Sequence, residues 1–173
     1  MRRVVSVLFS FLLVVGCGGP TEPAHSPSSV APQHPGQRAP LVGVTTREKV
    51  LETFPDWQAA FEKAEPDPEA SLRLAKVPAG AHVDVYFGTW CSDSRHEVPR
   101  LWKAMDRAGG PLPFTVRWIG VDRKKLAPEV APELDLKRVP TFVVRRGGVE
   151  RSRIVEHAPR GIETELADLL LAE

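Results

Sequence analysis

The chain has 173 residues, of which 42% are hydrophobic and 26% charged, a composition that supports one globular core and is too small for two. The formal net charge of +1 gives no electrostatic reason to expect nucleic acid or a strongly acidic partner, so we predict no nucleic-acid binding. The 17 prolines and 13 glycines, beside only 7% aromatic residues, indicate that part of the chain lies outside the core.

Residues 1–16 have the pattern of a secretory signal peptide. Two arginines precede an apolar run over residues 4–15, which is too short to cross a membrane. The run ends in Val14-Val15-Gly16-Cys17, which resembles the bacterial lipobox, where the cysteine becomes the new, diacylated N-terminus. We therefore expect lipidation at Cys17, and the alternative is an ordinary secretory signal with an incidental cysteine. Gly18 implies, from the same resemblance, a lipid-anchored protein of the bacterial cell envelope, in the outer membrane and facing the periplasm.

Residues 17–40 are predicted to form a lipid-anchored tether. This stretch contains six prolines and no aromatic residue, so it cannot bury a core and should stay disordered and semi-extended. At about 3.1 Å per residue, its reach is on the order of 70 Å. His25 and His34 lie in it, but two isolated histidines are typical of solvated spacers rather than of a metal site. The folded domain can therefore work at a distance from its membrane.

The folded domain is expected over residues 41–173 and begins with helices. Thr45-x-x-Glu48 has the spacing of a capping box, which predicts a helix starting at Thr46. Pro55 interrupts this helical pattern, and it either kinks the helix or begins a second one. A third, short helix is expected within residues 66–76, opened by the sequence Pro-Asp-Pro.

An apolar strand over residues 83–87 leads through a Gly-Thr turn to Cys91. The strand is short and rich in β-branched and aromatic residues, which suits a buried central strand. Beyond the cysteine, apolar side chains recur at helical spacing and predict a helix with one buried face; they are Val98, Leu101, Trp102 and Met105. Cys91 therefore lies at a helix start, where unpaired N–H groups and the helix dipole favour a thiolate. That is the position of a nucleophile.

The C-terminal half is predicted to complete a mixed sheet. We expect a strand over residues 114–121, a short proline-interrupted helical segment over 124–136, a hairpin of strands 141–145 and 149–154, and a closing helix over 162–170. A strand, a helix and a strand in succession imply parallel pairing through a right-handed crossover. The four arginines of the hairpin are expected to protect an edge strand, and contact with anionic lipid or a partner is the alternative.

Three features resemble the thioredoxin superfamily. Trp90-Cys91-Ser92-Asp93-Ser94 matches the Trp-Cys-x-x-Cys signature at a strand-to-helix junction, with serine in place of the second cysteine. Pro99 stands where that family carries a helix-kinking proline, and Val139-Pro140-Thr141 looks like its cis-proline loop. The resemblance covers residues 83–173, with 46–64 similar to the family's first helix. It implies an α/β, thioredoxin-like three-layer fold with a central mixed β-sheet flanked by helices.

The resemblance also implies roles for the motif residues. Cys91 would be the nucleophile, and Ser94 could donate a hydrogen bond to its thiolate. Because a hydroxyl cannot attack a mixed disulfide, the resolving step of a Cys-x-x-Cys pair is lost. One departure concerns the family's buried acid, which would fall at Val85. The acid here is Asp84, on the opposite face of the strand, so the usual internal proton acceptor is in doubt.

Three further residues are expected to form the substrate surface. By the same resemblance, Trp90 would shield the thiol and contact substrate. A cis Pro140 would place the Val139 backbone beside Cys91, where an extended substrate segment can pair with it. Thr141 would begin the adjacent strand.

Three functional hypotheses follow. If Cys17 is acylated, Cys91 is the only free thiol, which favours single-cysteine thiol–disulfide exchange, as a possible oxidoreductase or isomerase. Protein or small-molecule disulfides and thiols would be its partners, and an external or substrate thiol would resolve it. The alternative is a non-catalytic module that holds an extended partner segment near the membrane, and the third is a Cys91-linked homodimer. Ser92-Asp93 departs from the Gly-Phe of monothiol glutaredoxins, which can hold iron–sulfur clusters, so we expect no cofactor and no metal.

Overall fold

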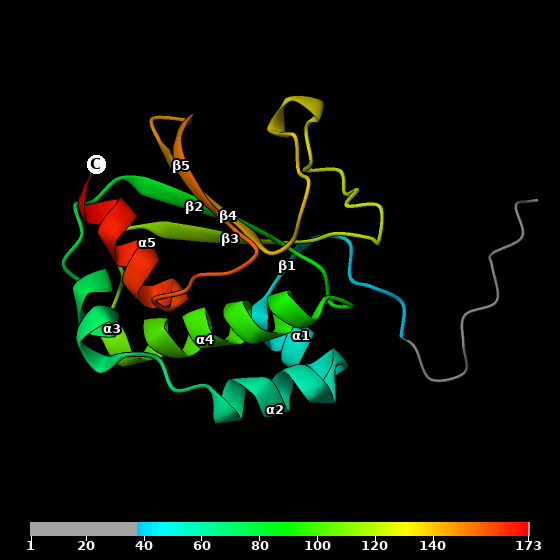
Figure 1. The fold of residues 1–173 in the computed structure, drawn as a ribbon, viewed down its shortest axis with the longest axis horizontal. Helices are drawn as coiled ribbons and strands as arrows, with labels where there is room; N and C mark the ends of the chain where they lie inside the picture. Colours follow the sequence, from blue (N-terminus) through cyan, green and yellow to red (C-terminus); the bar gives the residue numbers. More distant parts are fainter. Residues whose placement is uncertain (1–37, 173) are drawn as a thin grey trace, which may run out of the picture. The chain divides into compact units, whose positions relative to one another are not determined.

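The computed structural model describes residues 38–172, which belong to one compact unit (Figure 1). The predicted signal peptide, Cys17 and nearly all of the tether lie outside the described residues. Between residues 38 and 172, none of the helices is long and apolar enough to cross a lipid bilayer.

The strands form one mixed sheet in the order β1-β3-β2-β4-β5. Their bounds are β1 (Gly43–Thr45), β2 (Ala81–Phe87), β3 (Thr115–Gly120), β4 (Thr141–Arg146) and β5 (Val149–Val155). β2 and β3 pair in parallel, and the other neighbours are antiparallel. The predicted α/β class with a central mixed sheet is confirmed. β2 lies at the centre of the sheet, and its C-terminal end leads to Cys91.

The α-helices cover one face of this sheet, as Figure 1 shows. Their bounds are α1 (Arg47–Thr53), α2 (Pro55–Lys63), α3 (Pro68–Leu74), α4 (Ser92–Ala108) and α5 (Ile162–Leu171). Pro55 is the first residue of α2, so of the two predicted alternatives it begins a second helix. A proline is tolerated there because the first turn of a helix does not use its N–H groups.

The core on the helix side is built around aromatic rings. Trp57 of α2 packs against Phe87 of β2 and Trp102 of α4, with ring centroids 5.4 Å and 5.9 Å away. All three side chains are buried. The Trp57 indole Nε1 also donates to the carbonyl oxygen of Thr89 at 3.2 Å. The helix layer therefore fixes the turn that precedes Cys91.

The opposite face of the sheet carries a loop where a helix was predicted. The segment between β3 and β4 contains a single 3-10 turn, Pro132–Leu134, so the predicted helix over residues 124–136 is wrong. Prolines and left-handed φ angles at Lys125 (63°) and Asp135 (50°) interrupt a continuous helix. Leu134 and Val139 of this segment still pack against the sheet and form a second, smaller core. The third layer is thus a packed loop.

The N-terminal edge differs from the prediction in two respects. Thr46, not Thr45, caps α1, and its hydroxyl oxygen accepts a hydrogen bond from Lys49 N at 3.2 Å. Thr45 instead ends β1, a three-residue strand that the sequence did not predict. A Cβ at Gly120 would lie 2.3 Å from the carbonyl oxygen of Leu41, so glycine allows the chain that enters β1 to approach β3.

Candidate active site at Cys91

Cys91 is the N-cap residue of α4, the position predicted from the sequence. Its N–H donates to the carbonyl oxygen of Gly88 at 2.9 Å, and its own carbonyl accepts from Arg95 N at 3.1 Å. The side chain is partly exposed, and the thiol is free. The sulfur is therefore reachable from solvent and lies next to the unpaired N–H groups of a helix start.

The thiol contacts the loop that precedes β4. Cys91 Sγ donates to the carbonyl oxygen of Val139 at 3.2 Å, and the Val139–Pro140 peptide bond is cis, as predicted. The Val139 backbone thus lies beside the sulfur. Because this hydrogen bond uses the proton of the thiol, it has to break before the sulfur can attack a substrate.

Hydrogen bonds hold this loop on both sides of Pro140. The Pro140 carbonyl accepts from Glu156 N at 2.7 Å, which ties the loop to the segment after β5. The Thr141 hydroxyl donates to the carbonyl oxygen of Arg138 at 2.7 Å, and Thr141 begins β4 as predicted. Val139 and Thr141 are both buried, so the loop reaches the site through its backbone rather than through its side chains.

Trp90 forms one wall of the site. Its indole Nε1 donates to the carbonyl oxygen of Val121 at 3.0 Å, and its ring is partly exposed. A Cβ at Gly88 would lie 2.6 Å from the ring, so glycine is required where the indole folds back over the turn. The guanidinium carbon of Arg123 lies 5.3 Å from the ring centroid on a solvent-exposed turn. An aromatic surface with a cation against it therefore adjoins Cys91.

Ser94 is completely buried beneath the motif. Its hydroxyl oxygen accepts a hydrogen bond from Gly88 N at 3.2 Å, so it helps to fix the turn between β2 and α4. In the described part of the chain, Gly88 is its hydrogen-bond partner. The hydrogen bond from Ser94 to the Cys91 thiolate stays a prediction.

Asp84 faces away from the helices, while Val85 lies in the helix-side core, as the strand alternation predicted. The Asp84 carboxylate is 1% exposed and contacts Arg117 and His82 at 2.8 Å and Arg145 at 3.0 Å. Burial raises the pKa of Asp84, but hydrogen bonds from Arg117 and His82 outweigh it and hold the pKa below its ordinary value. Asp84 is thus the centre of an ion-pair network that joins β2, β3 and β4.

Glu97 is a buried acid that the sequence analysis did not single out. It is 1% exposed, and its Oε1 lies 2.9 Å from His157 Nδ1 and 3.2 Å from His96 Nδ1. Within the described residues, its Oε2 has no hydrogen-bond partner. In the sequence, the feature that could have identified Glu97 as buried is its position on the apolar stripe of α4, four residues before Leu101. Glu97 ties α4 to the segment after β5, which also holds the Pro140 loop.

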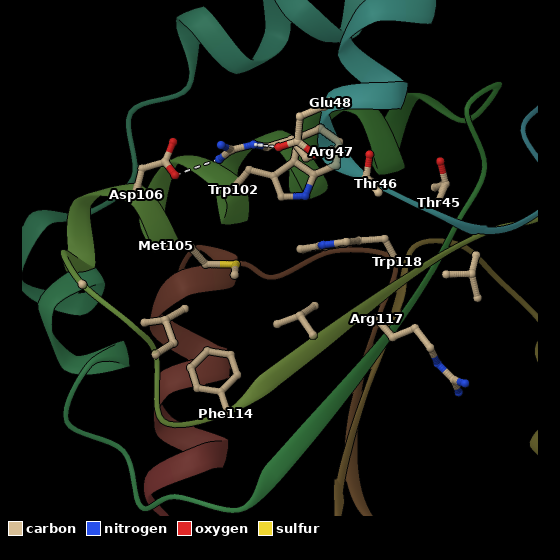
Figure 2. A pocket seen from close by; sticks show the side chains of 14 residues that line it. Thr45, Thr46, Arg47, Glu48, Trp102, Met105, Asp106, Phe114, Arg117 and Trp118 are labelled. Atoms are coloured by element: carbon tan, nitrogen blue, oxygen red, sulfur yellow. Dashed lines mark hydrogen bonds and ion pairs between the residues drawn. The ribbon is translucent and has the colours of Figure 1, made fainter.

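A cavity of about 610 Å³ lies apart from Cys91, between α4, the start of α1 and β3 (Figure 2). Its lining mixes apolar and charged side chains and includes Trp102 and Trp118, whose rings meet edge-on with centroids 5.5 Å apart. An ion pair between Arg47 and Asp106 at 2.7 Å closes part of its rim. None of the predicted site residues lines this cavity, so it is separate from the thiol site.

Fold and site together define a mixed-sheet α/β protein, in an arrangement consistent with a thioredoxin-like fold, with one cysteine at the start of its central helix. No protein-family model and no curated protein matches the chain. A Pseudomonas aeruginosa protein of unknown function is similar in structure, with a TM-score of 0.51 at 16% identity, over 76% of this chain and 84% of that one.

Two further solved structures are similar to the chain. An HIV epitope-scaffold has a TM-score of 0.51 at 17% identity, over 75% of this chain and 84% of its own. Mitochondrial thioredoxin 3 of Saccharomyces cerevisiae has 18% identity over 66% of this chain and 99% of its own, but its TM-score of 0.36 is too low to support an argument. At these identities the likeness concerns the fold alone.

Proposed function

We propose that the chain is a thioredoxin-superfamily protein of the bacterial envelope that performs single-cysteine thiol–disulfide exchange through Cys91. The observation that carries the proposal is the placement of its sulfur, partly exposed at the first turn of α4 and 3.2 Å from the Val139 carbonyl. A sulfur beside a helix start and a backbone acceptor can meet a disulfide that an extended segment carries. Trp90 would form the wall along which that segment lies.

The proposed reaction has two steps. The Cys91 thiol releases its proton to solvent, and the thiolate attacks one sulfur of a substrate disulfide. A new S–S bond forms to that sulfur, while the substrate's own S–S bond breaks and its other sulfur leaves as a thiolate. A second thiolate then attacks the substrate sulfur of the mixed disulfide and releases Cys91. Each S–S bond that breaks is replaced by one that forms, so the cycle needs no cofactor.

The second thiolate has to come from outside the described domain. Ser94 occupies the position of a resolving cysteine, and its hydroxyl cannot attack a disulfide. Cys91 is the one cysteine in residues 38–172. A substrate thiol or a small thiol of the envelope would therefore complete the cycle.

The proposed location rests on the sequence that precedes the described residues. Val14-Val15-Gly16-Cys17 supports diacylation of Cys17, and Gly18 supports an outer-membrane address that faces the periplasm. Several acyl chains on one terminus anchor a protein stably, where a single chain binds a membrane only reversibly. Anchored in this way, the domain would meet disulfides in an oxidising compartment.

Mass spectrometry of the full-length chain carrying Cys17→Ser tests the proposed exchange, because Cys91 is then the only thiol. We expect neutral 2-hydroxyethyl disulfide to form one adduct at Cys91 and added 2-mercaptoethanol to remove it. The matched control, Cys17→Ser/Cys91→Ser, should form no adduct. Absence of an adduct under conditions that label a short cysteine peptide would contradict the proposal.

The second candidate function is a non-catalytic module that holds an extended partner segment. Two departures from the superfamily pattern favour it: Ser94 replaces the resolving cysteine, and the buried acid is Asp84, on the sheet face away from the helices, where it pairs with Arg117. This function predicts that Cys91→Ser leaves partner capture from an envelope extract intact, and loss of capture would exclude it. A Cys91-linked homodimer is tested by non-reducing electrophoresis after oxidation, where a monomer alone would exclude it.

A further inference from the structure

A basic turn, Arg123-Lys124-Lys125, begins at the wall of the thiol site. Trp90 Nε1 donates to the carbonyl oxygen of Val121 at 3.0 Å, and the Arg123 guanidinium lies over the same indole ring. Arg123 and Lys124 are exposed, and Lys125 is partly exposed. The turn is therefore positioned by the residue that precedes Cys91.

The backbone of this turn is closed by Asp122. The Asp122 Oδ1 accepts from Lys124 N and Leu126 N, both at 2.8 Å, and its own N–H donates to the carbonyl oxygen of Leu126 at 3.1 Å. The Asp122 carboxylate, directly before the basic turn, is thus hydrogen-bonded to backbone N–H groups. Its charge still offsets part of the positive charge, so residues 122–125 carry a net charge of about +2 (three cations and one carboxylate).

The three cations of the basic turn differ from most others in the domain because they have no ion pair in the described part of the chain. Arg95, in the first turns of α4, pairs with Asp56, and Arg138, just before Val139, pairs with Glu156. Paired charges of this kind largely cancel at a distance. The basic turn therefore remains a source of positive field beside Trp90.

We infer that the basic turn selects disulfides that carry carboxylate groups and brings them to Cys91. This inference rests on the proposed exchange function and names its substrate class. Exposed cations near a reacting group raise the encounter rate of anions, and salt screens the effect. Asp93, exposed in the first turn of α4, opposes the attraction with one charge and leaves the net effect positive.

The test compares two disulfides of matched length and opposite charge, 3,3′-dithiodipropionate and cystamine, with the full-length chain carrying Cys17→Ser. Each rate of adduct formation is divided by the rate at which 2-mercaptoethanol reacts with the same disulfide. This ratio removes the difference in intrinsic reactivity between the two disulfides. At about 10 mM ionic strength, where the Debye length is about 30 Å, we expect the anionic disulfide to be favoured on the order of tenfold. Near 1 M salt, with a Debye length of about 3 Å, the ratio should approach one.

Two charge variants separate the basic turn from the protein's general charge. Arg123→Gln/Lys124→Gln should lower the low-salt ratio by about threefold or more. Lys63→Gln/Lys76→Gln, which removes two exposed cations that also have no ion pair within the described residues, at the end of α2 and just after α3, should leave the ratio unchanged. A ratio near one in the parent chain, or an equal fall in both variants, would overturn the inference.

The failures of the two proposals are distinguishable. If Cys91 reacts with neutral 2-hydroxyethyl disulfide but shows no charge preference, the inference is wrong and the exchange function stands. If none of the three disulfides reacts, both are wrong.

A second pair of substrates identifies the source of the carboxylate. Each is a peptide whose cysteine forms a disulfide with 2-mercaptoethanol, and glutamates flank that cysteine in one peptide and lysines in the other. If the glutamate peptide is preferred over the lysine peptide by more than 3,3′-dithiodipropionate is preferred over cystamine, the natural substrate is an acidic peptide. An equal or smaller preference supports a small-molecule substrate.

Discussion

Replacing Asp84 by asparagine is predicted to destabilise the domain without slowing exchange at Cys91. The carboxylate is 1% exposed, and its loss removes the counter-charge of Arg117 and Arg145. Breaking a buried pair from one side costs about 3–5 kcal/mol. Because the Arg117 side chain is 43% exposed, water compensates part of this loss, and we expect about 2–3 kcal/mol. For a domain of this size, that lowers Tm by roughly 6–12 °C.

The effect of Asp84→Asn on stability should depend on pH in a defined direction. The pKa of Asp84 is held below its ordinary value of 3.8, because its hydrogen bonds outweigh the effect of burial. A carboxyl with a lowered folded pKa contributes stability above its unfolded pKa, and that contribution is lost as pH falls through the folded pKa. The difference between the parent chain and the variant should therefore be full at neutral pH and shrink below about pH 4.

Thermal unfolding followed by tryptophan fluorescence at neutral and acidic pH, together with the adduct rate at Cys91, measures both halves of this prediction. The network lies on the sheet face away from the helices, so the rate in the folded variant should stay within about threefold of the parent rate. An unchanged Tm at neutral pH would refute the energetic reasoning. A folded variant that exchanges more than about tenfold slower would show that Asp84 serves the thiol.

Three further predictions concern the site and the anchor. Ser94→Cys should shorten the lifetime of the Cys91 mixed disulfide by about tenfold or more, because a second sulfur three residues along the helix attacks intramolecularly; an unchanged lifetime by mass spectrometry would contradict this. Gly88→Ala should cost about 1–3 kcal/mol and alter tryptophan fluorescence, because the new Cβ would lie 2.6 Å from the Trp90 ring; a variant as stable as the parent in urea unfolding would oppose it. Cys17→Ala should move the chain from the membrane fraction to the soluble fraction, and its retention with membranes would count against lipidation as the anchor.

Local patterns in the sequence predicted the centre of the fold well. β2 and α4 carry strong signals, an apolar run interrupted by Asp84 and an apolar stripe at helical spacing, and the structure confirms both. The hairpin of β4 and β5 is also confirmed, with glycines at its turn. These elements owe their form to residues that are close together in the sequence, which is why periodicity identifies them.

The segment between β3 and β4 could not be predicted in this way. A short proline-interrupted helix was predicted over residues 124–136, but Leu134 and Val139 are buried by contact with distant strands rather than by a helical face. β1 was missed because three residues carry too little pattern, and its pairing with β3 depends on the close approach of Leu41 to Gly120. Tertiary contact decides the form of both segments.

In the candidate site, too, some features follow from local sequence and others depend on tertiary contact. The position of Cys91 at a helix start follows from local pattern, whereas the contact with Val139 was implied by the resemblance of two motifs far apart in the sequence. The pairing of Glu97 with two histidines, and the position of Arg123 over Trp90, depend on side chains that only folding brings together. No spacing rule in a single sequence connects them.

The most direct test of the central claim compares the folded and the unfolded form of one thiol. The full-length chain carrying Cys17→Ser is reacted with 2-hydroxyethyl disulfide in buffer and in urea that unfolds it. Each rate is divided by the rate of 2-mercaptoethanol in the same solvent. If the fold activates Cys91 for exchange, the normalised rate should be about tenfold or more higher in the folded chain. A folded rate equal to or below the unfolded rate would contradict the exchange function and favour a module that binds without chemistry.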